Sequence, residues 1–119
     1  IYTCIDKFNV DLYVGIGGAP EGVLAAAAIK CFGGQFQGRL SISNNDEKLR
    51  ATKLGISDLK KKYYLNDMVK GDVIFCAAGV TTGELLNGIR VDATNFTADL
   101  LVLHSENKVN KIYTETFEI

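Results

Sequence analysis

The chain has 119 residues, of which 13 are basic and 14 acidic, so its formal net charge at pH 7 is -1. This length fits a single domain over residues 1–119. The near balance of charge argues against nucleic acid and acidic membrane surfaces as main partners. No apolar run approaches the length of roughly 18 residues that a membrane-spanning helix needs. We therefore expect a soluble, cytoplasmic domain.

The cysteines point to the same compartment. Cys4, Cys31 and Cys76 are odd in number and show no CxxC spacing. Cys31 and Cys76 lie inside apolar runs, which indicates buried free thiols in a reducing environment.

An apolar run that breaks at glycines and continues into alanines organises the first part of the chain: DLYVGIGGAPEGVLAAAA, residues 11–28. Asp11–Gly17 predicts a buried strand. A helix is predicted from Pro20 to Phe32, because proline suits a first helical position and the following Gly33-Gly34 suits a helix end. Since this helix has almost no polar face, we expect it to be buried.

One strand and two helices are predicted next; the first helix is charged and the second is short. Alternating apolar and polar residues over Phe36–Ile42 indicate a strand with one buried face. Asn44 or Asn45 can cap a solvated helix that runs to Leu54. A polar turn over Ser57–Lys62 and a short helix around Leu65–Val69 follow.

The second half is rich in β-forming runs. Asp72–Ala78 is almost continuously apolar and predicts a central strand buried on both faces. Three more β-like runs follow it: Gly88–Asp92, Phe96–His104 and Val109–Phe117. The turn Ser105–Lys108 between the last two predicts an antiparallel hairpin. The order of elements indicates an α/β layered domain in which helices flank a mixed sheet.

The glycine turn at Gly17 and Gly18 is the first candidate for chemistry. A dinucleotide-binding GxGxxG would need a third glycine where Pro20 stands. It would also need an acidic residue at the end of the second strand, where the chain has Arg39, Ser41 and Ser43 instead, so that motif is excluded. Two interpretations remain. The turn either binds an anion through backbone N–H groups at the helix start or serves only as a tight turn.

Glu21 follows in the first turn of the predicted helix. An acid here can simply stabilise the helix dipole. It can also bind a hard cation such as Mg²⁺ or Mn²⁺, which prefers carboxylate oxygens and shares them with substrate phosphates. One carboxylate does not complete such a site, so the remaining ligands must come from elsewhere.

The other candidates have weaker support. His104 is the single histidine, has no metal-ligand spacing and is interpreted as structural. The run Lys60–Tyr64 combines lysines with tyrosines but is more typical of a solvated face. Thr81 and Thr82 follow the predicted central strand, at a position where α/β sheets often bind ligands.

Three stretches, in this order, resemble a known family: DLYVGIGGAPEGVLAAAAIKCFGGQFQGRL, KKYYLNDMVKGDVIF and GVTTGELLNGIR. From Asp11 to Arg90 the chain closely resembles the class II (GlpX-type) fructose-1,6-bisphosphatases. Beyond Arg90 only the β-rich character matches. The resemblance implies the layered α/β sandwich of the lithium-sensitive sugar and inositol phosphatases.

The resemblance also implies an activity, a cofactor and two site residues. Family members hydrolyse fructose 1,6-bisphosphate to fructose 6-phosphate and phosphate in gluconeogenesis, with Mn²⁺ or Mg²⁺, and some accept sedoheptulose 1,7-bisphosphate. By this resemblance Glu21 is a metal ligand, Gly18 contacts substrate, and the full-length protein is a homo-oligomer.

The family's other metal carboxylates and its catalytic threonine lie upstream of this motif, so no catalytic residue is assigned here. The chain resembles the C-terminal portion of a longer phosphatase and is expected to be inactive alone. The alternative is a stand-alone regulatory or binding domain for a phosphorylated metabolite.

Overall fold

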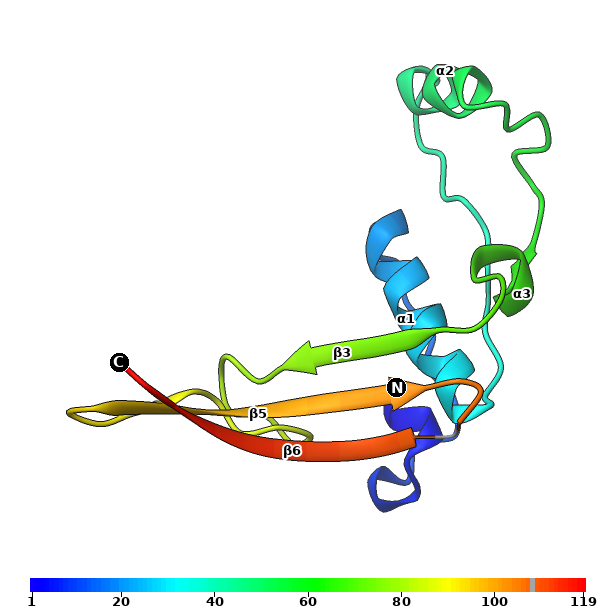
Figure 1. Cartoon of the computed structure of the whole chain (residues 1–119). Coiled ribbons are helices and arrows are strands. Elements are labelled where there is room, and N and C mark those ends of the chain that lie inside the picture. Colours follow the sequence, from blue (N-terminus) through cyan, green and yellow to red (C-terminus); the bar gives the residue numbers. More distant parts are fainter. Residues whose placement is uncertain (108) are drawn as a thin grey trace. The chain divides into compact units, whose positions relative to one another are not determined.

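Figure 1 shows the computed structural model of the chain, which describes residues 1–107 and 109–119. The expected α/β content is confirmed. The chain divides into two compact units, each described here by itself: Ile1–Ile29 with Gln35–Lys70 (unit 1), and Lys30–Gly34 with Gly71–Ile119 (unit 2). Among the described residues, no helix is both long enough and apolar enough to cross a membrane.

Unit 1 begins with two 3₁₀ turns, η1 (Tyr2–Cys4) and η2 (Asp6–Phe8). The rings of Tyr2 and Phe8 stack with their centroids 4.0 Å apart, which holds the two turns together. Asn9 ends the second turn in the left-handed conformation, with a φ of 50°.

The run expected to form the first strand is irregular in the structure. Asp11–Gly17 has no regular secondary structure. Its apolar side chains are exposed: Leu12 is 76% accessible, Val14 84% and Ile16 87%. A strand needs a neighbouring strand to pair its backbone groups, and none of the described strands pairs with this segment. The prediction of a buried strand here is therefore wrong for this chain.

The alanine-rich helix forms as expected. Helix α1 spans Ala19–Phe32, and Gly33 ends it with a φ of +75°, a conformation that glycine adopts without strain. Its buried residues lie in the second half: Ala26, Ala28 and Ile29. Val23 and Leu24 in the first half are 44% and 59% exposed. The helix is confirmed, but its expected burial applies only to the second half.

Helix α2 spans Asn45–Lys53, as the capping pattern predicts. The side chain of Asn44 accepts a hydrogen bond from the backbone N–H of Glu47, at 2.9 Å. The Glu47 carboxylate in turn accepts from the backbone N–H of Ser43, at 2.7 Å. Only Ala51 of this helix is buried, so the helix is a solvated one, as expected.

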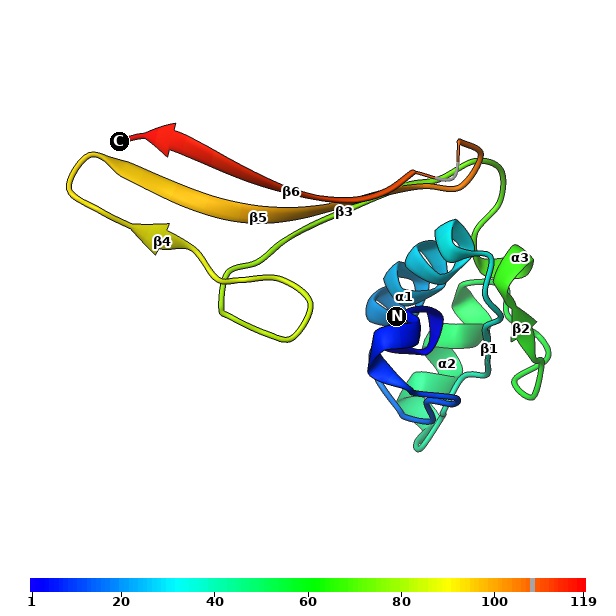
Figure 2. The same cartoon turned by 90° about the horizontal axis from the view of Figure 1, so that it is seen from below.

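The strand expected at Phe36–Ile42 is only two residues long in the structure. Strand β1 (Gln37–Gly38) is antiparallel to β2 (Tyr63–Tyr64), which leads directly into the short helix α3 (Leu65–Met68). Figure 2 shows β1 and β2 side by side. The polar turn expected before β2 contains no helix or strand.

Unit 2 is an antiparallel sheet built around one long strand. Its four strands are β3 (Ile74–Ala78), β4 (Arg90–Val91), β5 (Asn95–His104) and β6 (Val109–Glu118). β5 pairs with the other three. Where a mixed sheet was expected, every described strand pair is antiparallel.

The hairpin of β5 and β6 is confirmed and is paired along ten residues, from Asn95 opposite Glu118 to His104 opposite Val109. Phe96 stacks on Phe117, with the ring centroids 4.9 Å apart. Such aromatic cross-strand pairs stabilise a hairpin by roughly 0.2–1 kcal/mol. Of the four residues expected in its turn, Lys108 lies outside the described residues.

The two faces of this sheet differ in burial. Leu101 and Leu103 are 1% and 0% exposed and form the core of one face. Side chains alternate between faces, and on the opposite face Ile74 is 65% exposed and Cys76 is also exposed. The prediction that β3 is buried on both faces is therefore wrong, because nothing among the described residues covers the second face.

The thiols are free, as expected: Cys4 and Cys31 are half-buried and Cys76 is exposed. Cys31 lies in unit 2, where its thiol donates to the carbonyl of Val73 at 3.6 Å. Burial raises the pKa of this thiol. The expectation of a buried Cys76 is wrong, because no described residue covers the face of the sheet on which Cys76 lies.

Candidate functional site

The start of helix α1 brings the two predicted site residues together. The backbone N–H of Gly22 donates to the carbonyl of Gly18 at 3.0 Å, which forms the first turn of the helix. A Cβ atom added at Gly18 would overlap Glu21 Oε2 and lie 3.1 Å from Glu21 Cδ. The Glu21 carboxylate therefore lies against Gly18, in the space that the Cβ atom of another residue would occupy.

The contrast with the preceding glycine is informative. A Cβ added at Gly17 would meet nothing within 4 Å. A side chain at the second of the two positions would therefore displace the Glu21 carboxylate, whereas one at the first would not. Both glycines and Glu21 are exposed, so a ligand can reach the carboxylate and the backbone of the turn.

Glu21 offers an exposed carboxylate that no described group of side chains joins to form a metal site. No hydrogen bond or ion pair of its carboxylate is found among the described residues. Those residues also hold no group of three or more His, Cys, Asp or Glu side chains suited to a metal ion. The geometry thus supplies one exposed hard oxygen donor beside a backbone that a substrate could approach.

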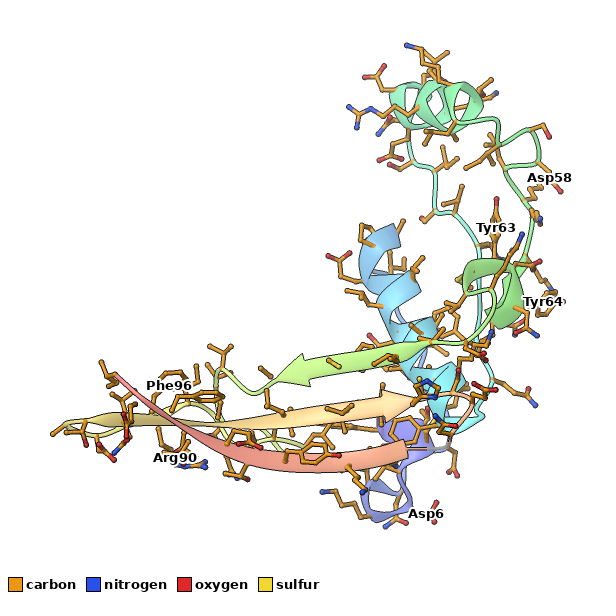
Figure 3. The ribbon with its side chains drawn as sticks, viewed as in Figure 1. Asp6, Asp58, Tyr63, Tyr64, Arg90 and Phe96 are labelled. Carbon is orange, nitrogen blue, oxygen red and sulfur yellow. The ribbon has the colours of Figure 1, made fainter. Side chains whose placement is uncertain are left out.

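The weaker candidates have structural roles. His104 Nδ1 accepts a hydrogen bond from the backbone N–H of Asn107 at 3.0 Å, within the hairpin turn. Lys61 lies over the ring of Tyr63, 5.0 Å from its centroid, and Lys60, Lys61 and Lys62 are exposed. Figure 3 shows Tyr63 and Tyr64 beside α3. The interpretations of a structural histidine and of a solvated lysine face both agree with this arrangement.

Thr82 serves the loop in which it lies. Its hydroxyl accepts a hydrogen bond from the backbone N–H of Gly88 at 3.0 Å. The loop closes where the N–H of Ile89 donates to the carbonyl of Val80 at 3.1 Å. A Cβ at Gly88 would lie 2.7 Å from the Thr82 nitrogen, so the two ends of the loop approach as closely as glycine permits.

A buried carboxylate that the sequence analysis did not identify ties this loop to the sheet. Asp99 of β5 is 4% exposed. Its Oδ2 accepts from the side-chain amide of Asn87 at 2.7 Å and from the Asn87 backbone at 3.1 Å. Its Oδ1 accepts from the Thr114 hydroxyl at 2.9 Å and from Arg90 Nη2 at 3.3 Å. Figure 3 labels Arg90 of β4 close to Phe96 of β5.

These hydrogen bonds lower the pKa of Asp99 from 3.8 to about 2. The bonds from Asn87 are the largest cause, and those from Thr114 and Arg90 add to them. Hydrogen bonds to a carboxylate favour its charged form. The available sequence signal was one acidic residue within the apolar run of β5, at a position where the alternation places a core residue.

Comparisons with known proteins identify the relatives of this chain. The family described as bacterial fructose-1,6-bisphosphatase, glpX-encoded, matches residues 1–117. A protein of Trichodesmium erythraeum, named D-fructose 1,6-bisphosphatase class 2/sedoheptulose 1,7-bisphosphatase, is 35% identical over 113 residues, which cover 84% of this chain and 33% of that protein.

Two further proteins carry the same name. That of Crocosphaera subtropica is 33% identical over 124 residues, covering 93% of this chain and 36% of the relative. That of Synechococcus elongatus is 34% identical over 113 residues, covering 84% of this chain and 33% of the relative. The chain therefore spans about a third of the length of these curated relatives. Since the family match covers nearly every residue, the chain belongs to the bacterial, glpX-encoded fructose-1,6-bisphosphatase family.

Proposed function

We propose that this chain is the C-terminal portion of a metal-dependent phosphatase, and that it forms part of one catalytic domain of the longer protein. The proposed substrates are fructose 1,6-bisphosphate, with sedoheptulose 1,7-bisphosphate as a second one. The proposed products are the sugar monophosphate and phosphate, a step in gluconeogenesis. Family membership over residues 1–117 carries the proposal, and the names of the relatives supply the substrates.

Glu21 would hold a divalent cation, Mn²⁺ or Mg²⁺, through its carboxylate. Its exposure and its hard oxygen donors fit such an ion. Because the described residues hold no complete ligand cluster, the other ligands would come from the rest of the longer protein. When bound, an ion of this kind lowers the pKa of a coordinated water and neutralises charge on phosphoryl oxygens.

Gly18 would admit the substrate close to the backbone. The absence of a side chain leaves room for the Glu21 carboxylate on one side of the turn. Backbone N–H groups at the start of α1 have no helical partners and can donate to a phosphate. The turn would therefore hold the metal-binding carboxylate and the phosphate within one helical turn of each other.

The exposed apolar run supports the view that other parts of the longer protein complete this chain. Leu12, Val14 and Ile16 alternate in sequence and are each more than three-quarters exposed. β-Forming residues of this kind gain stability when their backbone pairs and their side chains are covered. We infer that residues 11–17 become a strand in the longer protein, within a layered α/β sandwich of the lithium-sensitive phosphatase type.

The proposal is tested by phosphate release from fructose 1,6-bisphosphate with and without Mn²⁺, for this chain and for the longer protein in parallel. The expected result is metal-dependent turnover by the longer protein and none by the 119-residue chain. Full activity of the chain alone would contradict the proposed site, since it would show that no further ligands are needed. An inactive longer protein that still binds sugar phosphates without metal would instead favour a regulatory or binding domain.

A further inference from the structure

A hollow of about 400 Å³ lies within unit 1, between the segment that enters α2 and the turn that follows this helix. Its apolar lining consists of Leu40, Ile42 and Leu59, each of which is half-buried. Sites for small molecules have volumes of roughly 300–1,000 Å³ and combine apolar side chains with a few polar groups. The hollow therefore has the size and the apolar surface of a small-molecule site.

Two lysines also line the hollow: Lys48 of α2 and Lys60 of the turn that follows the helix. Both residues are exposed, and neither forms an ion pair with any residue in the described part of the chain. A hollow that carries charge of a single sign concentrates ions of the opposite sign. Its lining therefore favours an anionic ligand, although the net charge of the whole chain is -1.

None of the eight described residues that line the hollow is acidic. Two acids close to it in sequence bind backbone groups instead. The Glu47 carboxylate accepts hydrogen bonds from the backbone N–H and the hydroxyl of Ser43, at 2.7 and 3.0 Å. The carboxylate of Asp58, which is labelled in Figure 3, accepts from the backbone N–H of Lys60 at 2.9 Å. The lining of the hollow therefore carries two positive charges and no negative one.

Neutral polar side chains complete the lining. Asn44 is held in place, because its Oδ1 accepts from the Glu47 backbone N–H at 2.9 Å and its Nδ2 donates to the Ser43 hydroxyl at 3.4 Å. Asn45 also lines the hollow, and its exposed side-chain amide forms no hydrogen bond with the described residues. An amide NH₂ group and two ammonium groups supply donors for the oxygens of one phosphate.

We propose that this hollow binds a phosphate monoester with a small apolar body. Lys48 and Lys60 bind the phosphate, and the three aliphatic side chains contact the body of the ligand. A further segment of polypeptide fits less well, because parts of a protein that pack against one another bury roughly 600–1,500 Å², and only eight described residues line the hollow. The site uses neither Glu21 nor the glycine turn, so it does not depend on the proposed phosphatase activity.

Saturation-transfer NMR with phenyl phosphate tests the site in the longer protein, with EDTA present so that no metal ion contributes. The signal of the ring protons should saturate with a Kd on the order of 1 mM, as for other ligands of this size. Lys48→Gln and Lys60→Gln should each raise this Kd about threefold or more, and the double variant about tenfold, with the melting temperature unchanged. Lys53→Gln removes a charge from the same helix outside the hollow and should leave the Kd unchanged.

Phenol, which has the same ring without the phosphate, is the matched neutral probe and should bind more weakly than phenyl phosphate. Equal affinity for the two probes would overturn the proposed anion site. The absence of saturable binding in the longer protein would also overturn it, since another part of that protein would then fill the hollow. Binding that both lysine variants leave unchanged would place the probe elsewhere, for example at the glycine turn, and would equally contradict the proposal.

Discussion

Gly18 has a hydrogen atom in place of a side chain, and the carboxylate of Glu21 occupies the space that a Cβ atom would take. Gly18→Ala should displace that carboxylate while leaving the fold intact, because the overlapping atom is the end of a flexible side chain. In the longer protein, the Mn²⁺ concentration for half-maximal activity is expected to rise about tenfold or more, as for loss of one metal-orienting group.

Gly17→Ala is the matched control, because a Cβ there meets nothing within 4 Å. It should leave both the Mn²⁺ requirement and the melting temperature close to wild type. Equal metal requirements in the two alanine variants would contradict the role assigned to the Gly18–Glu21 contact.

The buried carboxylate of Asp99 makes the stability of unit 2 depend on pH in the acid range. Its pKa is about 2 in the folded chain and near 3.8 when unfolded. A lowered folded pKa means that the contribution to stability is complete above about pH 4 and is lost as the pH falls through about 2. Thermal unfolding of the sheet followed from pH 5 to pH 2 should therefore show a falling melting temperature.

Asp99→Asn removes the charge and should lower the melting temperature at pH 7 by about 5 °C or more, since it breaks a buried network. The variant should also respond less to acid between pH 4 and pH 2. Asp72→Asn changes an exposed carboxylate in the same unit and serves as the control. An Asp99→Asn variant with wild-type acid sensitivity would show that another carboxylate controls this transition.

At the scale of the element, the sequence predicted those features that depend on interactions between residues close together in the chain. The stop at Gly33, the hairpin between β5 and β6 and a cap at Asn44 or Asn45 could all be predicted, because each depends on residues close together in the chain; the structure selects Asn44. The strand expected at residues 11–17 depends on a distant partner for its backbone, and its conformation could not be obtained from its own sequence. Asp99 was missed for the same reason: its partners Asn87 and Thr114 lie 12 and 15 residues away.

The cap of α2 allows a direct test at this scale. Asn44→Ala should destabilise the chain by about 1 kcal/mol, because the Glu47 backbone N–H loses its acceptor. Urea unfolding followed by far-UV circular dichroism measures this change. Asn45→Ala, one residue further on and inside the helix, should cost much less. Equal losses at the two positions would contradict the assignment of Asn44 as the cap.

At the scale of the whole molecule, the candidate site could be predicted only in part. The position of Glu21 at a helix start followed from the glycine–proline pattern, and its contact with Gly18 required the structure. The further ligands that we propose for Glu21's ion could not be predicted, because the chain spans about a third of its relatives. The exposed apolar residues at 12–16 and the open face of the β3 strand are surfaces that we propose the rest of the longer protein covers.

The most direct measurement is the Mn²⁺ dependence of phosphate release from fructose 1,6-bisphosphate by the longer protein carrying Glu21→Gln. The glutamine keeps the shape of the side chain and removes the charge that would bind the ion. We expect a loss of activity of about 100-fold or more at fixed Mn²⁺, with the melting temperature unchanged. Glu47→Gln on α2, far from the turn in sequence, should remain active. Wild-type activity and metal dependence in the Glu21→Gln protein would contradict the assignment of Glu21 as a metal ligand.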